Sequence, residues 1–586
     1  MNRCEIIFPA KHALLSEIED FVSESHSNTK RTPFTVVLMA YYLNRLGFID
    51  YINDRVSWDP KQCKYSPGIL ALLLVLAPFL PSQKKIALVS LSDAYSKVDL
   101  KVITGYKYDP ITNEEIKATE LNDDQFARLL DRISTYGCEK LFHDLAIRVR
   151  CTFSLPENYI FHVDTTSHIL YGRYPTSGED STLHVTYGHS KDKRPDLKQI
   201  MTGAVTDGDG LPLFAMALNG NTADCSFNEL TISLLKSVYG PELRNHVYIA
   251  DSKLLTEPNV MALMQDEFPI PFISRIPSNF DKKLGETMKY RAYEQNEWED
   301  LGTCCSHPSK DSPLYWAITF SVVSSGFDMY VHVYKTTEKQ DKIEKKVKRE
   351  EENLRKELEK LGKREFFCEK DAKTECDSFL LSHSRLMVEA ELDVIQEVTL
   401  KNSRGRPSKT PKPPEEITRW KVVTVGIMRK EEKIEEEVKK ASTFCLLTNV
   451  SPREQSSRET LLLYKEQSHV ESLFSVLKQP MMAETIFLEK DERIQALMTL
   501  LYFTVLLHGI LRVISHIELE KEESPPRWGL NRRKIVRPTS QTMLGILAMF
   551  TLVSRDGEMV IDANHFEMRK DLGKILKVVR LDLGFL

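Results

Sequence analysis

The sequence predicts a mixed α/β protein, in which a mixed sheet covered by helices follows a helical N-terminal region and is interrupted by a strand-rich segment. Three observations predict this fold. Residues 1–150 show helical periodicity and few strand signals. From about residue 158, strand-like runs in a meander are followed by alternating helices and strands. A second strand-rich stretch precedes a strongly helical segment.

We expect five regions along the chain. They are a helical N-terminal region (1–150), the first part of a core with a mixed sheet (151–276), a strand-rich segment (277–455), the second part of the core (456–515) and a C-terminal region (516–586). The length of 586 residues is consistent with about three to five domains.

The composition is that of an ordinary globular protein. The chain is 42% hydrophobic and 28% charged, which excludes global disorder. The 79 Lys and Arg and 84 Asp and Glu give a net charge of −5, so any binding to nucleic acid must depend on local basic surfaces. Ten Cys without a CxxC pair argue against a disulfide scaffold or a structural zinc site, and favour reduced thiols in a cytosolic protein.

We expect neither a signal peptide nor a membrane span. The N-terminus lacks a long apolar run followed by a small-residue cleavage site. The apolar stretches 69–80 and 496–511 are shorter than the roughly 18–20 unbroken apolar residues that a span requires. Both are predicted to be buried core helices.

Two helices are the clearest elements of the N-terminal region. The apolar period that starts at Val36 is closed by Gly47. The second helix begins at Asn122, a candidate N-cap with Gln125 at the third helical position, and ends at Gly137.

The core is predicted to begin with a run of strands and to continue with alternating helices and strands. Strands are expected at 159–164, 183–187, 199–205, 211–218, 246–251 and 271–276, and helices at 227–238 and 257–265. The turn Asp207-Gly208-Asp209-Gly210 fits a hairpin better than a calcium site.

The strand-rich segment contains strand-like runs at 315–323, 329–334, 421–425 and 443–448. The charged segment 338–363 has only a thin apolar seam, which favours a solvated helix or helical hairpin over a partner-binding coiled coil. Residues 401–414 are predicted to form an exposed linker. Helical periodicity returns at 460–514.

Asp164 and Asp251 are candidates for metal binding because each is predicted to end an apolar strand. Carboxylates at strand ends are also common turn formers. If the two strands are neighbours in one sheet, both carboxylates reach the same edge, where they can bind a hard divalent cation. His162 shares a strand face with Asp164, and a packed core histidine is as good an interpretation as a catalytic one.

A second constellation lies on a predicted helix. At about 100° per residue, four polar side chains fall in one row beside an apolar stripe: Tyr464, Gln467, Glu471 and Lys478. An acid for metal, with a phenol and an ammonium for phosphate, would suit the handling of phosphodiesters. The alternative is an amphipathic helix with incidental polar neighbours.

With these motifs the chain resembles DDE transposases of the prokaryotic insertion-sequence type, which carry a Tyr-x2-Arg-x3-Glu-x6-Lys signature. Asp164 and Asp251 match the first two acids and Glu471 the third, while Gln467 replaces the arginine. The segments 188–199 and 220–224 also resemble family segments, as does the tail of the signature. The resemblance covers roughly residues 30–515.

The resemblance implies an RNase H-like core, namely a five-stranded mixed sheet flanked by helices, with a β-rich insertion domain before the last catalytic helix. It implies that Asp164, Asp251 and Glu471 hold two Mg²⁺ ions, for which Mn²⁺ can substitute, and cleave and join DNA by phosphoryl transfer. Double-stranded DNA, both the transposon inverted repeats and the target, would be the partner, bound by a homodimer in the cytoplasm of a prokaryotic cell.

DNA contacts are expected from the signature residues Tyr464, Gln467 and Lys478, and from a basic loop between core strands with Lys191, Lys193 and Arg194. Two further segments, 401–412 and 527–537, each hold five positive residues and no acid. Residues 404–407 resemble a minor-groove hook, although a solvated loop is the better interpretation.

Three functions remain open at this point. The first is an active transposase that cuts and joins its own element. The intact Asp164, Asp251 and Glu471 favour this function. The second, which the change to Gln467 keeps open, is a transposase-derived DNA-binding or assembly protein without catalysis. The third is an RNase H-like nuclease that cuts without joining. No Gly-rich phosphate loop is present, so nucleotide-driven activity is not expected.

Overall fold

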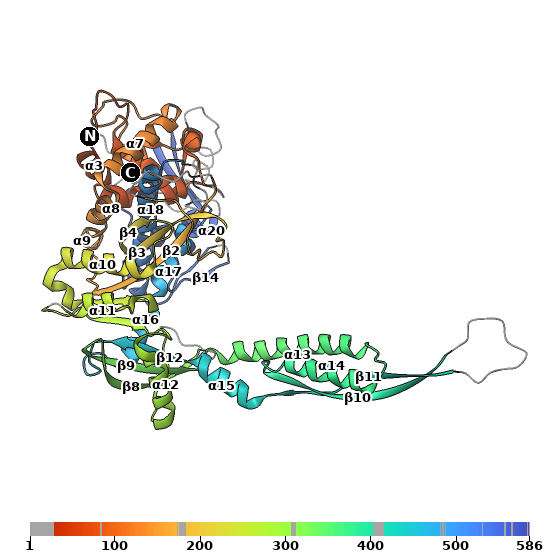
Figure 1. Cartoon of the computed structure of the whole chain (residues 1–586). Coiled ribbons are helices and arrows are strands. Elements are labelled where there is room, and N and C mark those ends of the chain that lie inside the picture. The colour runs from red at the N-terminus through yellow and green to blue at the C-terminus, as the bar shows by residue number, and fades with distance from the viewer. Residues whose placement is uncertain are drawn as a thin grey trace, which may run out of the picture. The chain divides into compact units, whose positions relative to one another are not determined.

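The computed structural model describes residues 29–82, 85–172, 174, 183–265, 267–305, 312–401, 415–480, 482, 486, 488–529, 531–555, 558–563, 566–582 and 584. The chain divides into two compact units. Unit 1 contains Met1–Ser274 and Leu463–Leu586, and unit 2 contains Arg275–Leu462. Each unit is described by itself (Figure 1).

The N-terminal part of unit 1 is helical, as predicted. Its helices are α2 (Phe34–Arg45), α3 (Phe48–Arg55), α4 (Pro67–Leu76), α5 (Leu91–Tyr95), α6 (Leu100–Thr104), α7 (Asp123–Tyr136), α8 (Cys138–Ala146) and α9 (Val149–Thr152). Gly47, with φ +65°, follows α2, and the predicted capping box of Asn122 and Gln125 starts α7. Both sequence signals therefore specify the helix boundaries that they predicted.

The sheet of unit 1 contains β2 (Ile160–Leu170), β3 (Lys198–Asp207), β4 (Pro212–Leu218), β5 (Val247–Ala250) and β6 (Phe272–Arg275). Their order is β4-β3-β2-β5-β6. β2, β3 and β4 pair antiparallel as a meander, and β5 and β6 continue the sheet in parallel with β2. The predicted mixed sheet is confirmed.

Two core predictions were wrong. Asp164 does not end a strand, because β2 continues to Leu170 through buried polar residues. The hydrogen bonds between β2 and β3 continue the strand beyond the apolar residues on which the prediction from the sequence relied. Residues 183–187 form no strand; only an isolated bridge joins Thr186 to Gln199.

Helices cover both faces of this sheet. The helices after the meander are α10 (Asp224–Tyr239) and α11 (Glu257–Met264). Gly203 of β3 faces α10 so closely that an added Cβ would lie 2.2 Å from the Phe227 ring. The neighbouring Thr202 points to the opposite face, where its hydroxyl lies 3.1 Å from the Tyr502 hydroxyl. α10 and the helix of Tyr502 therefore lie on opposite faces.

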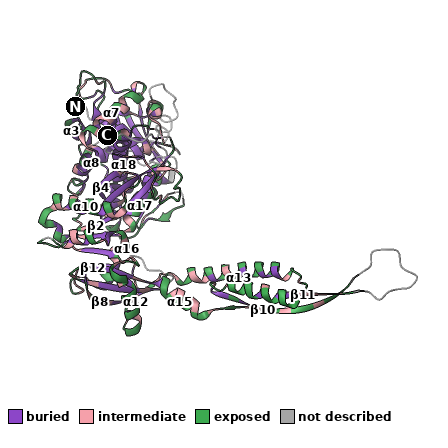
Figure 2. Ribbon diagram, viewed as in Figure 1, coloured by how far each residue is buried: buried purple, intermediate pink, exposed green. Residues whose placement is uncertain are grey.

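The helix of Tyr502 is α18 (Asp491–Glu520), the central helix of unit 1. Its length and apolar composition would suit a membrane span, but 94% of its most apolar 18-residue window is buried inside the unit. It packs against α4, α7, α8 and β4, and Figure 2 shows it in the buried colour. It is the buried core helix that the sequence predicted for 496–511.

The C-terminal residues add elements that the sequence did not predict. They are β13 (Arg527–Trp528), β14 (Arg533–Lys534), α19 (Ser540–Leu547), β15 (Phe550–Arg555), β16 (Glu558–Ala563), α20 (Phe566–Arg569) and α21 (Leu572–Val578). β15 pairs with β1 (Lys30–Pro33) and with β16, so the C-terminal region completes the N-terminal domain.

Unit 2 contains a sheet of order β12-β9-β8-β7 and a long two-stranded ribbon. Its strands are β7 (Glu299–Thr303), β8 (Leu314–Ser324), β9 (Phe327–Thr336), β10 (Val388–Lys401), β11 (Glu415–Arg429) and β12 (Thr443–Thr448). Its helices are α12 (Leu284–Gln295), α13 (Gln340–Gly362), α14 (Glu369–Ser382), α15 (Glu431–Ser442) and α16 (Ser457–Lys465), the last of which runs on into unit 1. The predicted strand-rich character of this segment is confirmed.

The charged segment is one helix, α13, and it is solvated on one side only. Val347, Leu354, Leu358 and Leu361 of its thin seam are buried. α13 and α14 lie along the ribbon of β10 and β11 (Figure 1). Of the predicted linker at 401–414, Lys401 ends β10, and residues 402–414, which include the predicted hook, lie outside the described residues.

Candidate active site

Asp164 and Asp251 lie side by side in the sheet. β2 and β5 are parallel neighbours, and their last registered pair is Val163 with Ala250. Asp164 and Asp251 follow this pair directly, one on each strand. The condition that the sequence left open, that the two strands be adjacent, is therefore met.

Burial and repulsion raise the pKa values of these two carboxyl groups. The pKa of Asp164 is raised to about 6, mainly by desolvation and in part by the charges of Asp251 and Asp224, against the lowering effect of Lys191. Desolvation also raises the pKa of Asp251, and Asp224 again contributes. The charges of Asp164, Asp251 and Asp224 therefore repel one another at the place where β2 and β5 lie side by side.

Asp224 is a functional candidate that the sequence interpretation missed. It lies in the first turn of α10, and its Oδ1 accepts a hydrogen bond from the Thr165 hydroxyl, next to Asp164. The signal was present, because Asp224 ends a segment that resembles the transposase family. No residue pattern connected it with β2, since only the packing of α10 brings it there.

Lys191 is the cation of this cluster. Its Nζ lies 3.6 Å from Asp164 Oδ1 and 3.4 Å from Asp224 Oδ2. The same ammonium donates to the carbonyl and hydroxyl oxygens of Thr165 at 2.7 and 2.8 Å. In this conformation the side chain that was predicted to contact DNA neutralises the aspartates.

The other two basic residues of the loop, Lys193 and Arg194, are exposed. Arg194 forms a two-pronged ion pair with Asp196, at 2.8 and 2.7 Å. Lys193 has φ +59°.

Glu471 reaches the same face of the sheet on α17 (Ser468–Leu477). α17 packs on β2 and β3, with the His469 ring 6.2 Å from the ring of His162. Because side chains alternate along a strand, Asp164 shares the face of His162 and is directed to the side of α17. The Glu471 side chain itself is exposed.

The signature residues do not lie on one continuous helix, so the predicted row is wrong between Tyr464 and Glu471. α16 ends at Lys465, and α17 begins at Ser468. At the junction the N–H groups of Gln467 and Val470 donate to carbonyl groups three residues earlier, both at 3.2 Å. Such bonds wind the chain more tightly than an α-helix, which changes the angles on which the row depended.

The side chain of Lys478, at the C-terminal end of α17, contacts the basic loop. Its Nζ lies 2.8 Å from Asp192 Oδ1, one residue after Lys191. Tyr464 and Gln467 are half-buried at the junction. The structure therefore brings Lys478 and Lys191 to neighbouring positions, while Tyr464 and Gln467 lie at the other end of α17.

The described residues contain no group of three His, Cys, Asp or Glu side chains that could hold a metal ion. Asp164, Asp251 and Glu471 are thus not assembled as a metal site in this conformation. The donor set nevertheless suits a hard cation, because the aspartates repel one another and already share the Lys191 ammonium.

Two families of sequences match the chain. Residues 34–147 match a domain of unknown function, DUF4277. Residues 176–507, more than half of the chain, match the family described as "Transposase DDE domain". The chain belongs to the DDE transposases. The matched segment includes Asp251 and Glu471 and begins after Asp164.

DDE transposases are enzymes that transfer phosphoryl groups and use divalent metal ions, so this chain is an enzyme of that class. No curated protein matches the sequence. Among solved structures, "Cryo-EM structure of piggyBac transposase synaptic complex with hairpin DNA (SNHP)" aligns with a TM-score of 0.36 and 11% identity. The alignment covers 89% of this transposase and 82% of the other chain. A TM-score this low does not establish a shared fold.

Three other predicted features of the transposase have structural explanations. His162 is fully buried, and neither ring nitrogen has a hydrogen-bond partner among the described residues. Asp207 accepts from the N–H groups of Asp209 and Leu211, so the Asp-Gly turn is a hairpin, as predicted. In the basic segment 527–537, Trp528 is buried.

Proposed function

We propose that this transposase cleaves the ends of a prokaryotic insertion sequence and joins them to target DNA, using an RNase H-like core. The observation that supports the proposal most directly is the position of Asp164 and Asp251, one residue beyond the last pair of two adjacent parallel strands. The helix of Glu471 packs on the face that Asp164 shares.

Asp164, Asp251 and Glu471 would hold a pair of Mg²⁺ ions, with Mn²⁺ as a substitute. Bound metal ions would supply Lewis acidity at the scissile phosphodiester. Lys191 occupies the cationic position between Asp164 and Asp224, so binding of the metal requires this ammonium to move or to share the carboxylates. Asp224 would then hold Lys191 beside the site as a positioning residue.

The residues around the acids would bind the DNA backbone. Lys193 and Arg194 belong to the same loop as Lys191, and Lys478, at the C-terminal end of α17, pairs with Asp192 of that loop. Tyr464 and Gln467 precede α17. An ammonium or guanidinium contributes to phosphate binding through charge, and a phenol or amide through hydrogen bonding. We expect a homodimer that holds two DNA ends.

The test is an in vitro reaction with the purified full chain, Mg²⁺ and a duplex that carries the inverted repeats flanking the reading frame. We expect nicked ends and then joined products. The Asp164→Asn and Asp251→Asn variants should bind the same duplex without cleaving it. Full cleavage by either variant would contradict the proposal.

A transposase-derived DNA-binding protein without catalysis is a second candidate. The observation that keeps it open is that Gln467 stands where the transposase signature has an arginine. In the same reaction, this second function predicts binding without nicking at every Mg²⁺ and Mn²⁺ concentration. Nicking without joining would instead indicate a nuclease.

A further inference from the structure

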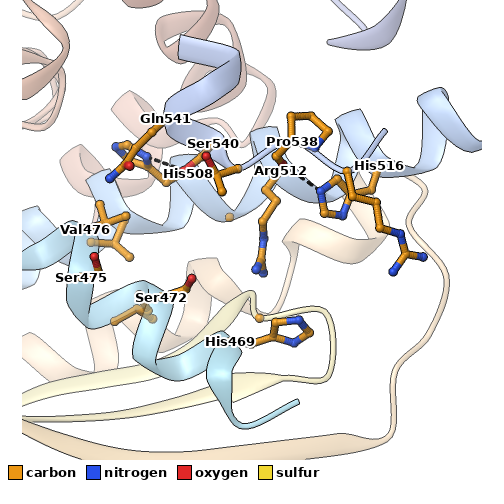
Figure 3. Close-up of a pocket in the computed structure, with 16 residues that line it drawn as sticks. His469, Ser472, Ser475, Val476, His508, Arg512, His516, Pro538, Ser540 and Gln541 are labelled. Atoms are coloured by element: carbon orange, nitrogen blue, oxygen red, sulfur yellow. Dashed lines mark hydrogen bonds between the residues drawn. The ribbon is translucent and has the colours of Figure 1, made fainter. Parts of the chain in front are cut away.

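A pocket of about 330 Å³ lies on the flank of α17 within unit 1. Its walls come from α17, α18, the first turn of α19 and the hairpin turn at Gly210 (Figure 3). Its lining includes no Asp or Glu side chain. Five of its side chains are guanidinium or imidazole groups: His469, His508, Arg512, His516 and Arg537.

Arg512 is the central cation of the pocket. In Figure 3 its guanidinium group points from α18 toward the side of His469 and the hairpin turn. It donates to the carbonyl oxygen of Asp209. Gly210 has φ +74°, and a Cβ there would lie 2.2 Å from an Arg512 nitrogen. The turn therefore leaves room for this arginine only because residue 210 is a glycine.

The acids behind the pocket are already paired with cations. Asp207 and Asp209 both form ion pairs with Arg150. Arg537 lies 2.6 Å from Glu520. The lining therefore contains two guanidinium groups, of which Arg537 is paired with a carboxylate and Arg512 donates to a carbonyl oxygen, while no carboxylate lines the pocket.

Each of the three histidines has one ring nitrogen held by an oxygen. His469 Nδ1 lies 2.8 Å from the Gly208 carbonyl, and His516 Nε2 lies 2.9 Å from the Pro538 carbonyl. His508 Nδ1 lies 2.9 Å from the Ser540 hydroxyl. These bonds fix the rings in the wall, so the pocket is preformed.

Hydroxyl and N–H groups complete the lining. Ser472 and Ser475 contribute hydroxyls from α17. α19 begins at Ser540, and its first two residues, Ser540 and Gln541, line the pocket, while the Thr539 hydroxyl accepts from the Thr542 N–H. The first N–H groups of a helix lack partners within the helix and favour an anion, which adds to the two guanidinium groups.

We propose that this arginine–serine pocket binds a phosphate group of the DNA backbone beside the strand that the transposase cuts. The inference rests on the proposed function, because it requires DNA to pass α17. Ser472, which lines the pocket, directly follows Glu471 in α17. A phosphate bound at Ser472 would therefore contact the residue next to the third candidate acid. The pocket would thereby set the position of the strand relative to α17.

The test is Gln541→Glu, compared with Thr542→Glu. Both residues are exposed in the first turn of α19, and only Gln541 lines the pocket. A carboxylate in the first turn of a helix is stabilising, so neither variant is expected to unfold the protein. Gln541→Glu is nearly isosteric and adds one negative charge to the pocket.

Binding of a fluorescent DNA duplex to the full chain is measured in EDTA over a range of salt concentrations. We expect Gln541→Glu to bind several-fold more weakly, with the slope of log Kd against log salt reduced by about 1, the value of one lost phosphate contact. Arg537→Gln should reduce the slope similarly, and Thr542→Glu should retain the wild-type slope.

Equal slopes for Gln541→Glu, Thr542→Glu and the wild type would overturn the inference. The second probe is inorganic phosphate, followed by thermal stabilisation of the same proteins. Stabilisation that Gln541→Glu abolishes, without any change in DNA binding, would assign the pocket to free phosphate and overturn the DNA assignment. Because binding is measured without a divalent metal, failure of the proposed function would appear separately, as absence of cleavage in Mg²⁺.

Discussion

Asp164 and Asp251 occupy matching positions on adjacent parallel strands, each directly after the registered pair of Val163 and Ala250. Residues that follow a registered pair on neighbouring parallel strands lie side by side, so this register brings together two carboxylates that are 87 residues apart in the sequence. Burial raises the pKa of Asp164, and repulsion from Asp251 and Asp224 adds to this effect. The fold therefore keeps carboxylates together in a partly buried position, which suits a site for a divalent cation.

Asp164→Asn should stabilise the protein at pH 7 while abolishing cleavage. The pKa of Asp164 is about 6 in the folded protein and near 3.8 when unperturbed, so the folded state binds more protons between these values. The free energy of unfolding therefore falls as pH rises from about 4 to 6 and stays lower above pH 6. Removing the charge should recover about 1–3 kcal/mol at pH 7.

Chemical denaturation of Asp164→Asn and the wild type across this pH range checks the sign. The difference in the free energy of unfolding should vanish below about pH 3, where the wild-type carboxyl group is protonated in both states. A variant that is less stable than the wild type at pH 7 would show that the carboxylate is held by favourable contacts.

Lys191→Gln should destabilise the protein unless a divalent ion is present. The ammonium lies within 4 Å of both Asp164 and Asp224, and its loss leaves these carboxylates without their cation. We expect a loss of about 1–3 kcal/mol. Millimolar Mg²⁺ should raise the melting temperature of the variant more than that of the wild type. Equal effects of Mg²⁺ on the two proteins would argue against a metal at this edge.

Glu471→Gln should abolish cleavage without changing stability. Its side chain is exposed on α17, and surface substitutions usually change stability by less than about 0.5 kcal/mol. Glu492→Gln, an exposed glutamate in the first turn of α18, is the matched control and should cleave normally. Strand cleavage assays and melting temperatures of both variants provide the comparison; normal cleavage by Glu471→Gln would remove it from the catalytic set.

Leu354→Ala should loosen α13 from the ribbon in unit 2. Leu354 is 1% exposed in a small cluster that also contains Val347, Leu358 and Met387, so we expect a local loss of about 2–5 kcal/mol. Hydrogen exchange should accelerate in α13, β10 and β11. Leu381→Ala on α14, where the side chain is 76% exposed, is the control and should leave exchange unchanged.

The sequence alone determined the local elements and the identity of the chemistry. Gly47 and the Asn122 capping box specified helix boundaries, and the alternation of apolar residues specified most strands, because both depend on neighbours within a few residues. The motifs around Asp164, Asp251 and Glu471 indicated a DDE transposase. These signals are short in range or depend on the order of residues.

Only the tertiary structure decided which distant groups meet. The register of β2 and β5 places Asp164 beside Asp251, and the packing of α10 brings Asp224 to Lys191. The break between α16 and α17 removed the predicted row, because backbone hydrogen bonds at the junction follow a tighter turn than periodicity assumes. Electrostatic interactions between groups far apart in the chain depend on distances in space, and these arise only when strands and helices pack.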